Sequence, residues 1–499
     1  MNILLIYPQY SHSTEFDTRA PSMSLVYLAA ALERDGHRVE IYDASLGPVV
    51  KSGKIFRYGV SEEEMRDFLR SREFDIVGIT CSFAAKWKFV SKIAEQVKEI
   101  NPRALVSTGG LFPTYSWKYC LNDCGAIDFI MLGEAELSFA RVAGNIAKGA
   151  DINDACKNAD GVVWRTEKEI HYNPKKEYNN KLDDLPFPAW HLADLKKYFL
   201  LQKNIFELAA PCLPILSSRS CPNQCRFCNM YLTHGRIWRP RSADNVLDEI
   251  EYLIKRFGVR NFYFIDDNFS INLERAKNIC QGLIKRNLNI KYNFHNGLSI
   301  KTIDGELVQL MKKSGCTSVC LAIESGSERI RNGVYKKNIS AEKIFEVFNL
   351  FHKAKIPTVG YFMIGAPGET RADFEETKKL SAKLPMSLIT SSIFTPYPET
   401  ELYDECKKKG WLLSEDNSDK KDWVEMYTPM LKTPDFEPKD LVAWQKELYY
   451  SFIWHHWPAL IKEALRPGGI VNFDTIGKFI GFTKFSLFRI IDSIKNFNE

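Results

Sequence analysis

Three closely spaced cysteines are the side chains best suited to hold a metal centre. Cys221, Cys225 and Cys228 lie in the stretch SSRSCPNQCRFCNM, separated by three residues and then by two. Cysteine thiolates are the usual ligands of iron–sulfur clusters, and a full set is four. Three cysteines leave one iron without a protein ligand, and an open coordination position is where a metal centre does chemistry. The spacing therefore predicts a cluster-binding loop with one reactive iron.

A structural zinc site is the alternative use of these cysteines. Zn²⁺ takes four ligands, commonly as two closely spaced pairs. The chain has 12 cysteines, but only Cys225 and Cys228 form a CxxC pair, and His234 is a candidate fourth ligand. The absence of a second pair favours the iron–sulfur interpretation.

The CxxxCxxC motif, with aromatic Phe227 directly before its last cysteine, resembles that of the radical S-adenosylmethionine (radical SAM) enzymes. In that family the open iron binds SAM through its amino and carboxylate groups. One electron from the cluster then cleaves SAM to a 5′-deoxyadenosyl radical. The resemblance implies a [4Fe–4S] cluster on the three cysteines, SAM as a cofactor, and an electron donor such as flavodoxin or ferredoxin. The protein would supply binding and orientation, and the cofactors the difficult chemistry.

Three motifs further along the chain resemble the SAM-contacting strands of the same family. They are IDDNF, LAIESGSERI and FMIGAPGET. The resemblance implies that the SAM contacts are Phe227, Asp266, Asp267, Glu324, Ser325, Ile364 and Gly365. In this assignment the IDDNF motif contacts the amino group of SAM. The LAIES stretch contacts its ribose and methionine carboxylate, and the FMIG stretch contacts its adenine.

Other interpretations of these residues remain open from the sequence. The pair Asp266–Asp267 is also consistent with a helix cap and a solvated acid. Glu324 is also consistent with a surface ion pair to Arg329. The stretch TPYPETELY resembles the last strand of the family except at Glu399, where glycine is usual, and this departure affects a turn.

The elements ahead of the cysteines alternate between short apolar strands and amphipathic helices. Strands are predicted at residues 2–7, 39–42, 74–80, 104–107 and 129–132, and helices at 24–35, 62–72 and 89–100. Such alternation is typical of a doubly wound parallel sheet, a Rossmann-like fold. Ligands of these sheets bind beyond the carboxyl ends of the strands. No GxGxxG motif is present, which disfavours a dinucleotide.

The strand ends of this first region resemble the cobalamin-binding domain that precedes one class of radical SAM enzymes. The similarity lies in DIVGITCS, STGGLFPT and DFIMLGEAE. It implies that cobalamin is lined by Ser82, Gly109, Gly110, Pro113, Thr114, Gly133 and Glu134, with Ser82 near the nucleotide. No DxHxxG motif is found, so the cobalt is expected to lack a histidine ligand. The alternative is a vestigial domain without a cofactor.

Four further cysteines lie in or near the first region. They are Cys81, Cys120, Cys124 and Cys156. Methylthiotransferases of the radical SAM family bind an extra cluster on three N-terminal cysteines, and Cys120 and Cys124 are spaced to share a helix face. Buried free thiols are common, and that interpretation is preferred.

The remaining chain completes a four-part organisation. The expected parts are a Rossmann-like cobalamin-binding domain at 1–150, a hairpin and Pro-rich linker at 151–205, a partial (β/α)6 barrel at 206–405, and a helical region at 406–499. The hairpin is predicted at 162–164 and 169–172, and the barrel strands after the cysteines at 261–265, 291–294, 318–324, 358–364 and 387–394. Chemistry is expected at the carboxyl ends of the barrel strands.

The composition and the predicted C-terminal helices indicate where in the cell the protein is expected. The chain has 499 residues, a formal net charge of +5 and 45% hydrophobic residues, so it is globular and needs no nucleic-acid partner. The sequence predicts neither a signal peptide nor an apolar stretch of transmembrane length, so a cytoplasmic protein with reduced thiols is expected. Residues 438–465 and 476–494 are aromatic and partly basic. They pack on the protein, or they lie at the inner face of a membrane.

The two resemblances together imply a cobalamin-dependent radical SAM enzyme that methylates an unactivated carbon of a small-molecule or lipid substrate. In that reaction cobalamin passes on a methyl group from one SAM, and a second SAM gives the radical that removes a substrate hydrogen. Cyclisation, oxidation or rearrangement, with or without cobalamin, is the alternative. A non-catalytic cobalamin- or cluster-binding sensor is the alternative from another class.

Overall fold

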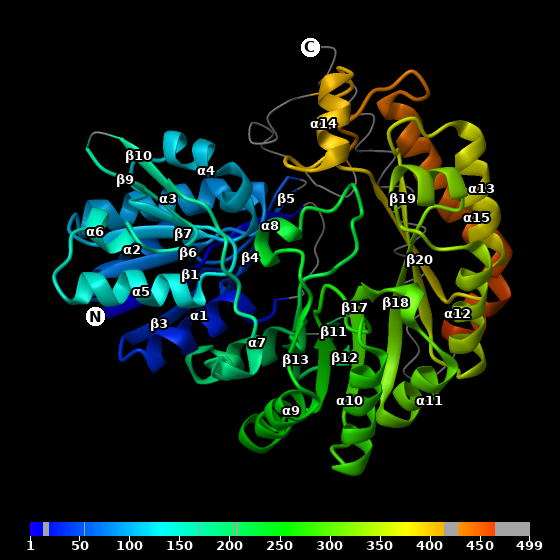
Figure 1. Ribbon diagram of the computed structural model, residues 1–499, viewed down its shortest axis with the longest axis horizontal. Coiled ribbons are helices and arrows are strands. Elements are labelled where there is room, and N and C mark those ends of the chain that lie inside the picture. Colours follow the sequence, from blue (N-terminus) through cyan, green and yellow to red (C-terminus); the bar gives the residue numbers. More distant parts are fainter. Residues whose placement is uncertain are drawn as a thin grey trace.

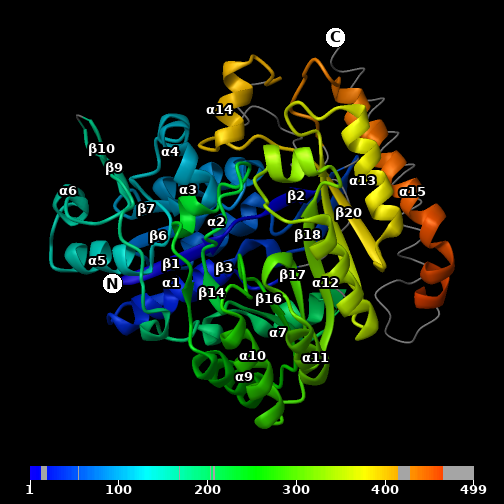
Figure 2. The ribbon, with the colours of Figure 1, turned by 45° about the vertical axis from the view of Figure 1, so that its right-hand side comes forward.

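The computed structural model describes residues 1–12, 19–53, 55–167, 169–202, 204–205, 208–413 and 428–464. Figure 1 shows two α/β units side by side, the first in blue and cyan and the second in green to orange. In Figure 2 the long helix α15 (Pro438–Ala464) lies along the outer side of the second unit.

A seven-stranded sheet forms the centre of the first unit, in the order β10-β9-β8-β7-β6-β1-β3. Its strands are β1 (Asn2–Tyr7), β3 (Arg38–Asp43), β6 (Ile76–Thr80), β7 (Leu105–Gly109), β8 (Phe129–Met131), β9 (Val162–Arg165) and β10 (Ile170–Asn173). The first five pair in parallel, and β9 and β10 add antiparallel strands. The predicted doubly wound sheet is confirmed. The hairpin that the sequence places after this domain extends the sheet at its edge.

Helices cover both faces of the sheet because successive strand side chains point to opposite sides. On β1, Leu4 and Ile6 join one apolar cluster, whereas Ile3 and Leu5 join another. The first cluster includes side chains of α2, α3 and α4, and the second those of α1, α5 and α6. These helices are α1 (Met23–Arg34), α2 (Glu62–Arg70), α3 (Trp87–Ile100), α4 (Leu111–Asp123), α5 (Glu136–Ala147) and α6 (Ile152–Cys156).

Several short elements of the first unit and the linker were not predicted. A small antiparallel sheet, in the order β2-β5-β4, follows β1 and β3. Its strands are β2 (Tyr10–His12), β4 (Val49–Ser52) and β5 (Ile55–Tyr58), and the linker carries α7 (Leu195–Leu201), β11 (Asn204–Ile205) and β12 (Leu208–Ala209). They are too short for hydrophobic periodicity to reveal them.

Six parallel strands form the second unit, in the order β13-β16-β17-β18-β19-β20. They are β13 (Cys212–Ile215), β16 (Asn261–Phe264), β17 (Lys291–Leu298), β18 (Cys316–Glu324), β19 (Thr358–Ile364) and β20 (Leu388–Ile393). The helices between them are α9 (Ala243–Phe257), α10 (Leu273–Lys285), α11 (Gly305–Ser314), α12 (Ala341–Lys353) and α13 (Arg371–Lys383), and α14 (Glu401–Lys408) follows. The predicted six-fold partial barrel is confirmed.

The C-terminal helix α15 packs against α13 and β20. The Trp444 ring stacks on Phe374 with centroids 5.1 Å apart, and Tyr449 accepts a hydrogen bond from the Ser391 backbone N–H at 2.9 Å. The packing interpretation therefore holds for the inner face of α15. The predicted second amphipathic segment, residues 476–494, lies outside the described residues. Within the described part of the chain, no helix is long and apolar enough to cross a membrane.

Candidate functional site

The three cysteines occupy one loop that a short pair of strands closes at its base. This loop runs between β14 (Ser218–Arg219) and β15 (Arg239–Pro240), which pair antiparallel with Arg219 opposite Arg239. Its second half forms the short helix α8 (Tyr231–His234). Ser220, directly before Cys221, adopts φ +71°, a conformation that strains a non-glycine residue and is common at functional sites.

The cysteine thiols are only partly covered and lie within electrostatic reach of one another. Burial raises the pKa of Cys228 to about 12. Burial also raises the pKa of Cys225, and the nearby Lys337 ammonium opposes this rise. Asn268 donates a hydrogen bond from Nδ2 to the Cys221 sulfur at 3.5 Å. A thiolate ligand is stabilised by such a donor and cation.

This donor set fits a three-cysteine cluster. Among the described residues no three His, Cys, Asp or Glu side chains converge on a single metal position. The thiolates of a cubane cluster bind separate irons, so they surround the cluster rather than converge on one point. The Nδ1 atom of His234, the candidate fourth zinc ligand, lies 3.0 Å from the Glu134 carboxylate.

The structure turns both aspartates of the IDDNF motif towards the segment before Cys221. Asp266 is buried and accepts hydrogen bonds from the Ser217 hydroxyl at 2.7 Å and its N–H at 3.2 Å, and from the Ser218 hydroxyl. Burial raises the pKa of Asp266. Asp267 accepts from the Ser220 N–H at 3.0 Å. Both carboxylates brace the cysteine loop, and their expected contact with the SAM amino group stays a prediction.

Asn268, which follows these aspartates, is a site residue that the sequence analysis missed. Its Nδ2 reaches Cys221, and its buried Oδ1 has no hydrogen-bond partner in the described part of the chain. An unsatisfied buried acceptor is costly. The amide is thus positioned to accept from a ligand held beside the cluster loop.

Glu324, at the end of β18, forms a buried ion pair with Lys337. Its carboxylate lies 2.8 Å from the Lys337 Nζ, and the two side chains are 13% and 14% exposed. Burial opposes the Lys337 ammonium, but Glu324 and the thiols outweigh burial and raise the pKa of Lys337. Glu324 has φ +70° beside an irregularity in the pairing of β18 with β19. The surface pair with Arg329 is not formed, because Arg329 binds Asp373.

The remaining predicted SAM residues lie on neighbouring strand ends. The Ser325 hydroxyl lies 3.1 Å from that of Thr377, and Ile364 is fully buried. Gly365 has φ +85°, and its N–H donates to Glu369 at 2.6 Å. The Phe227 ring packs edge-on against Tyr335, with centroids 5.2 Å apart.

The predicted cobalamin residues gather at the carboxyl edge of the first sheet. Ser82 follows β6, Gly109 ends β7, Gly110 lies between β7 and α4, and Gly133 follows β8. The Thr114 hydroxyl donates to the Gly110 carbonyl at 2.7 Å and accepts from the Gly133 N–H at 3.0 Å, while Pro113 is buried in α4. Gly110 has φ +109°, and a Cβ there would lie 2.6 Å from the Cys81 carbonyl oxygen. The close approach at Gly110 is to the chain's own backbone, and the expected cobalamin contacts at this sheet edge stay a prediction.

Glu134, the last of the predicted cobalamin residues, is engaged with the second unit. Its carboxylate binds Arg219, Arg239 and His234 of the second unit. The sequence could not show this, because the arginines lie more than 80 residues away in the chain.

The four other cysteines are buried. Burial raises the pKa of each of them, namely Cys81, Cys120, Cys124 and Cys156. Their interpretation as thiols without a cluster stays a prediction.

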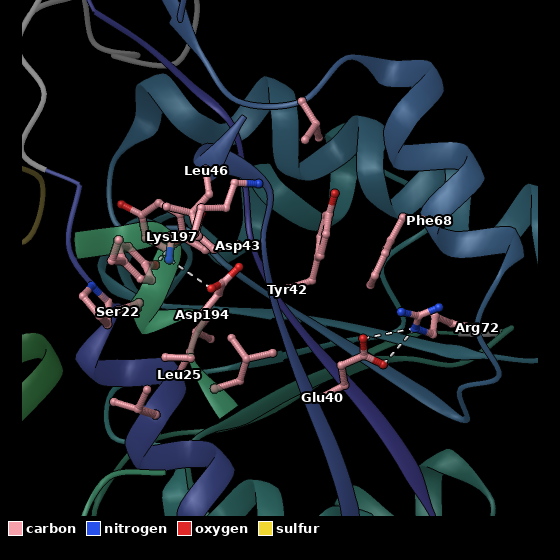
Figure 3. Close-up of a pocket in the computed structure, with 17 residues that line it drawn as sticks. Ser22, Leu25, Glu40, Tyr42, Asp43, Leu46, Phe68, Arg72, Asp194 and Lys197 are labelled. Atoms are coloured by element: carbon pink, nitrogen blue, oxygen red, sulfur yellow. Dashed lines mark hydrogen bonds and ion pairs between the residues drawn. The ribbon is translucent and has the colours of Figure 1, made fainter. Parts of the chain in front are cut away.

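A pocket of about 340 Å³ lies beside the edge strand β3, away from all predicted site residues. Figure 3 shows the rings of Tyr42 and Phe68 side by side on its wall, with the Glu40–Arg72 ion pair beneath them. Asp43 accepts hydrogen bonds from Tyr198 and Ser45 at this wall. None of the cysteine, SAM or cobalamin residues lines it, so it has no part in the assignment.

Two family models match the chain. The Radical SAM superfamily model matches residues 215–381, and the B12 binding domain model matches residues 13–143. The chain belongs to the cobalamin-dependent radical SAM enzymes. The cofactors of this radical SAM enzyme are accordingly SAM, a [4Fe–4S] cluster and cobalamin.

Individual relatives span nearly the whole enzyme. An uncharacterised methyltransferase of Pyrococcus horikoshii is 27% identical over 480 residues, which cover 93% of this chain and 97% of the relative. The cytidylyl-2-hydroxyethylphosphonate methyltransferase of Streptomyces wedmorensis is 26% identical, with 79% of each chain covered. The solved structure of the cobalamin-dependent radical SAM enzyme OxsB shares the fold, with a TM-score of 0.71 and 16% identity over 98% of this chain and 72% of OxsB.

Proposed function

We propose that this radical SAM enzyme methylates an unactivated carbon atom of a small-molecule or lipid substrate. The observation that carries the proposal is the contact between the two cofactor-binding units. A Cβ on Gly133, at the carboxyl end of β8, would lie 2.9 Å from the Thr233 carbonyl oxygen of α8, which directly follows the cysteines. A methyl carrier and a radical source must reach the same substrate atom, and adjacent sites allow this. The methyltransferase names of both relatives support the same reaction class.

The chain's own residues would hold and orient these groups. When bound, the cluster and SAM supply the radical that removes a hydrogen atom, and cobalamin carries the methyl group that replaces it. Cys221, Cys225 and Cys228 hold the cluster, and Asn268 offers its free Oδ1 to the SAM ammonium. Lys337 offers an ammonium to the SAM carboxylate, held in place by Glu324.

Phe227 and the neighbouring barrel strand ends would complete the SAM pocket. Phe227 and Tyr335 wall off the cluster loop from water, because both rings pack against apolar neighbours. Ser325, Ile364 and Gly365 would line the ribose and adenine, as the family resemblance implies. For cobalamin, the proposed lining is Ser82, Gly109, Gly110, Pro113, Thr114 and Gly133.

Anaerobic reconstitution tests the proposal. The protein is purified with iron, sulfide and hydroxocobalamin, and iron, cobalt and 5′-deoxyadenosine formation are measured. We expect both metals in the parent, and a Cys225→Ser variant that keeps cobalt but forms no 5′-deoxyadenosine. Incubation with trideuteromethyl-labelled SAM and a small-molecule and lipid extract should give a product carrying the label on carbon. SAM cleavage with cobalt bound but no labelled carbon product would overturn methylation and favour cyclisation or oxidation.

Two partner classes belong to the same proposal. A flavodoxin or ferredoxin would supply the electron, and reduction by such a protein in place of dithionite tests this. Contact with a lipid surface is supported by a stripe of exposed apolar side chains on α15, namely Tyr450, Trp454, Trp457 and Ile461. Trp and Tyr favour the membrane–water interface. A Trp454→Ala/Trp457→Ala variant should co-sediment less with anionic phospholipid vesicles, and unchanged sedimentation would contradict the contact.

A further inference from the structure

A buried charge cluster joins the two units at the base of the cysteine loop. The first unit contributes Glu134, after β8, and Glu136, at the start of α5. The second unit contributes Arg219 of β14 and Arg239 of β15. The side chains of Glu134, Arg219 and Arg239 are 5%, 4% and 2% exposed. Their contacts therefore lie inside the interface rather than at its rim.

Glu134 contacts both arginines at once. Arg239 donates through both terminal nitrogens to its carboxylate, with Nη1 2.8 Å from Oε2. Arg219 Nη1 lies 3.2 Å from the same Oε2, and Arg219 Nη2 donates to Glu136 at 2.6 Å. His234 adds a contact to Oε1 at 3.0 Å. All the acids come from the cobalamin-binding unit and all the basic groups from the radical SAM unit.

The two arginines mark the two ends of the cysteine loop. They lie opposite each other in the β14–β15 pair, so residues 220–238 form a loop whose base Glu134 holds from the other unit. Cys221 lies two residues beyond Arg219. A displacement of Glu134 would therefore be passed directly to the loop that carries the cluster ligands.

The contacts form an interdependent set. Two carboxylates balance two guanidinium groups. Burial raises the pKa of Glu134, but the hydrogen bonds from Arg239 and His234 and the charge of Arg219 outweigh burial and lower it. Removing one member leaves an uncompensated buried charge, which is strongly destabilising. Such a set defines one geometry of the interface, because a shifted arrangement would break several charged hydrogen bonds together.

We propose that Glu134 is a positioning residue that fixes the separation and orientation of the cysteine loop relative to the cobalamin-binding unit. It acts through Arg219 and Arg239, and it replaces the expected role of Glu134 as a cobalamin contact. The role deepens the proposed methylation, which requires both cofactors to reach one substrate. It also stands on the interface alone, so its test does not need the substrate.

The experiment compares the parent with Glu134→Gln, an isosteric variant that removes only the charge. Glu99→Gln is the matched control, because Glu99 pairs with Arg66 on the exposed surface of the same unit. In the apoprotein, Glu134→Gln should lower the unfolding temperature by about 5–15 °C and speed proteolysis of the linker between the units. In the reconstituted protein, iron and cobalt contents should match the parent. The magnetic coupling between cob(II)alamin and the reduced cluster, measured by electron paramagnetic resonance, should change.

Two outcomes overturn the proposal. A loss of cobalt from Glu134→Gln with parent-like unfolding of the apoprotein would make Glu134 a cobalamin contact instead. Parent-like unfolding, proteolysis and magnetic coupling together would leave it without a positioning role. If Glu134→Gln folds poorly, a Glu134→Gln/Arg239→Gln variant tests the same contact through its unfolding temperature. If Glu134 and Arg239 are coupled, the unfolding temperature of the double variant should be no lower than that of Glu134→Gln. Additive decreases in unfolding temperature would contradict the coupling. Failure of methylation would leave these readouts unaffected.

Discussion

At the scale of single residues, the Lys337–Glu324 ion pair links the cysteine loop to the end of β18. Lys337 lies within electrostatic reach of Cys225 and is held 2.8 Å from Glu324. An ammonium beside the cysteine loop would suit a ligand carboxylate. The pair therefore predicts a role in SAM affinity rather than in holding the cluster.

Replacing Lys337 by methionine should weaken SAM binding. Losing a charge-assisted hydrogen bond costs about 1.5–3 kcal/mol, so the Kd for SAM should rise about 10- to 100-fold. Equilibrium dialysis of the reconstituted enzyme with radiolabelled SAM measures the Kd, and the iron content should stay at the parent value. Lys379→Met is the control, because Lys379 is exposed on α13. A Kd equal to that of the control would remove Lys337 from the SAM site.

Glu369 is a buried carboxyl whose charge state should influence stability near neutral pH. Its Oε2 accepts hydrogen bonds from the N–H groups of Gly365 and Ala366, while its Oε1 has no partner among the described residues. Burial raises the pKa of Glu369 from its ordinary 4.5 to about 7. An acid with a raised folded pKa stabilises the fold most at low pH, and that contribution is lost as the pH rises from 4.5 to about 7.

A Glu369→Gln variant should remove this pH dependence. At about pH 5 the protonated parent and the variant should unfold at similar temperatures. Above about pH 8 the variant should be the more stable protein, because it has no buried carboxylate to accommodate. Unfolding of the apoprotein followed by circular dichroism across this range measures the difference. A constant difference between parent and variant at every pH would contradict the raised pKa.

At the scale of elements, α15 supports the barrel from outside. Trp444 stacks on Phe374 of α13, and Gln445 donates a hydrogen bond to the Ser391 carbonyl of β20 at 2.6 Å. A Cβ on Gly365 would lie 2.8 Å from Leu441, so α15 also packs closely on the loop after β19. The helix therefore stabilises the strand end that the family resemblance assigns to adenine.

Truncating the inner face of α15 should destabilise the fold far more than truncating its outer face. Trp444→Ala should cost about 3–5 kcal/mol of unfolding free energy, the usual range for a large aromatic removed from a core. Trp454→Ala should cost little, because that side chain is 78% exposed. Denaturant unfolding of both variants gives the comparison, and equal losses would show that α15 does not pack as described.

At the scale of the whole molecule, two ligand-binding units share one interface. Cobalamin belongs to the first unit and the cluster to the second. A ligand that binds only the folded state stabilises it by an amount set by its concentration and Kd. Each cofactor should therefore stabilise the protein even when a residue that binds the other cofactor has been replaced.

Hydroxocobalamin should raise the unfolding temperature of the parent and of Cys225→Ser by the same amount. At a concentration about 100-fold above Kd the expected stabilisation is about 2.7 kcal/mol. Differential scanning calorimetry under anaerobic conditions measures it, with a Gly110→Val variant as the control that blocks the sheet edge. A stabilisation lost in Cys225→Ser would mean that cobalamin binding needs the cluster.

The sequence predicted features that depend on local spacing or on short motifs. The cysteine loop follows from three cysteines at fixed intervals, and the sheet and barrel follow from alternating apolar strands and amphipathic helices. Lys337 was missed because it belongs to no motif, and Asn268 was missed because only the aspartates of the IDDNF motif were assigned a contact. Their importance comes from partners, Glu324 and Cys221, that only folding brings close.

By itself the sequence determined the two α/β units and the family, and it predicted the cluster ligands, because these depend on periodicity and local spacing. Only the tertiary structure decided the partners of charged groups. Glu134 resembles a cobalamin contact in its GE motif, yet it meets Arg219 and Arg239 across the interface. Asp266 and Asp267, whose contact with SAM stays a prediction, brace the cysteine loop through hydrogen bonds that the sequence did not show. A carboxylate buried on folding must find the donors that the fold brings to it, and those donors lie far away in the chain.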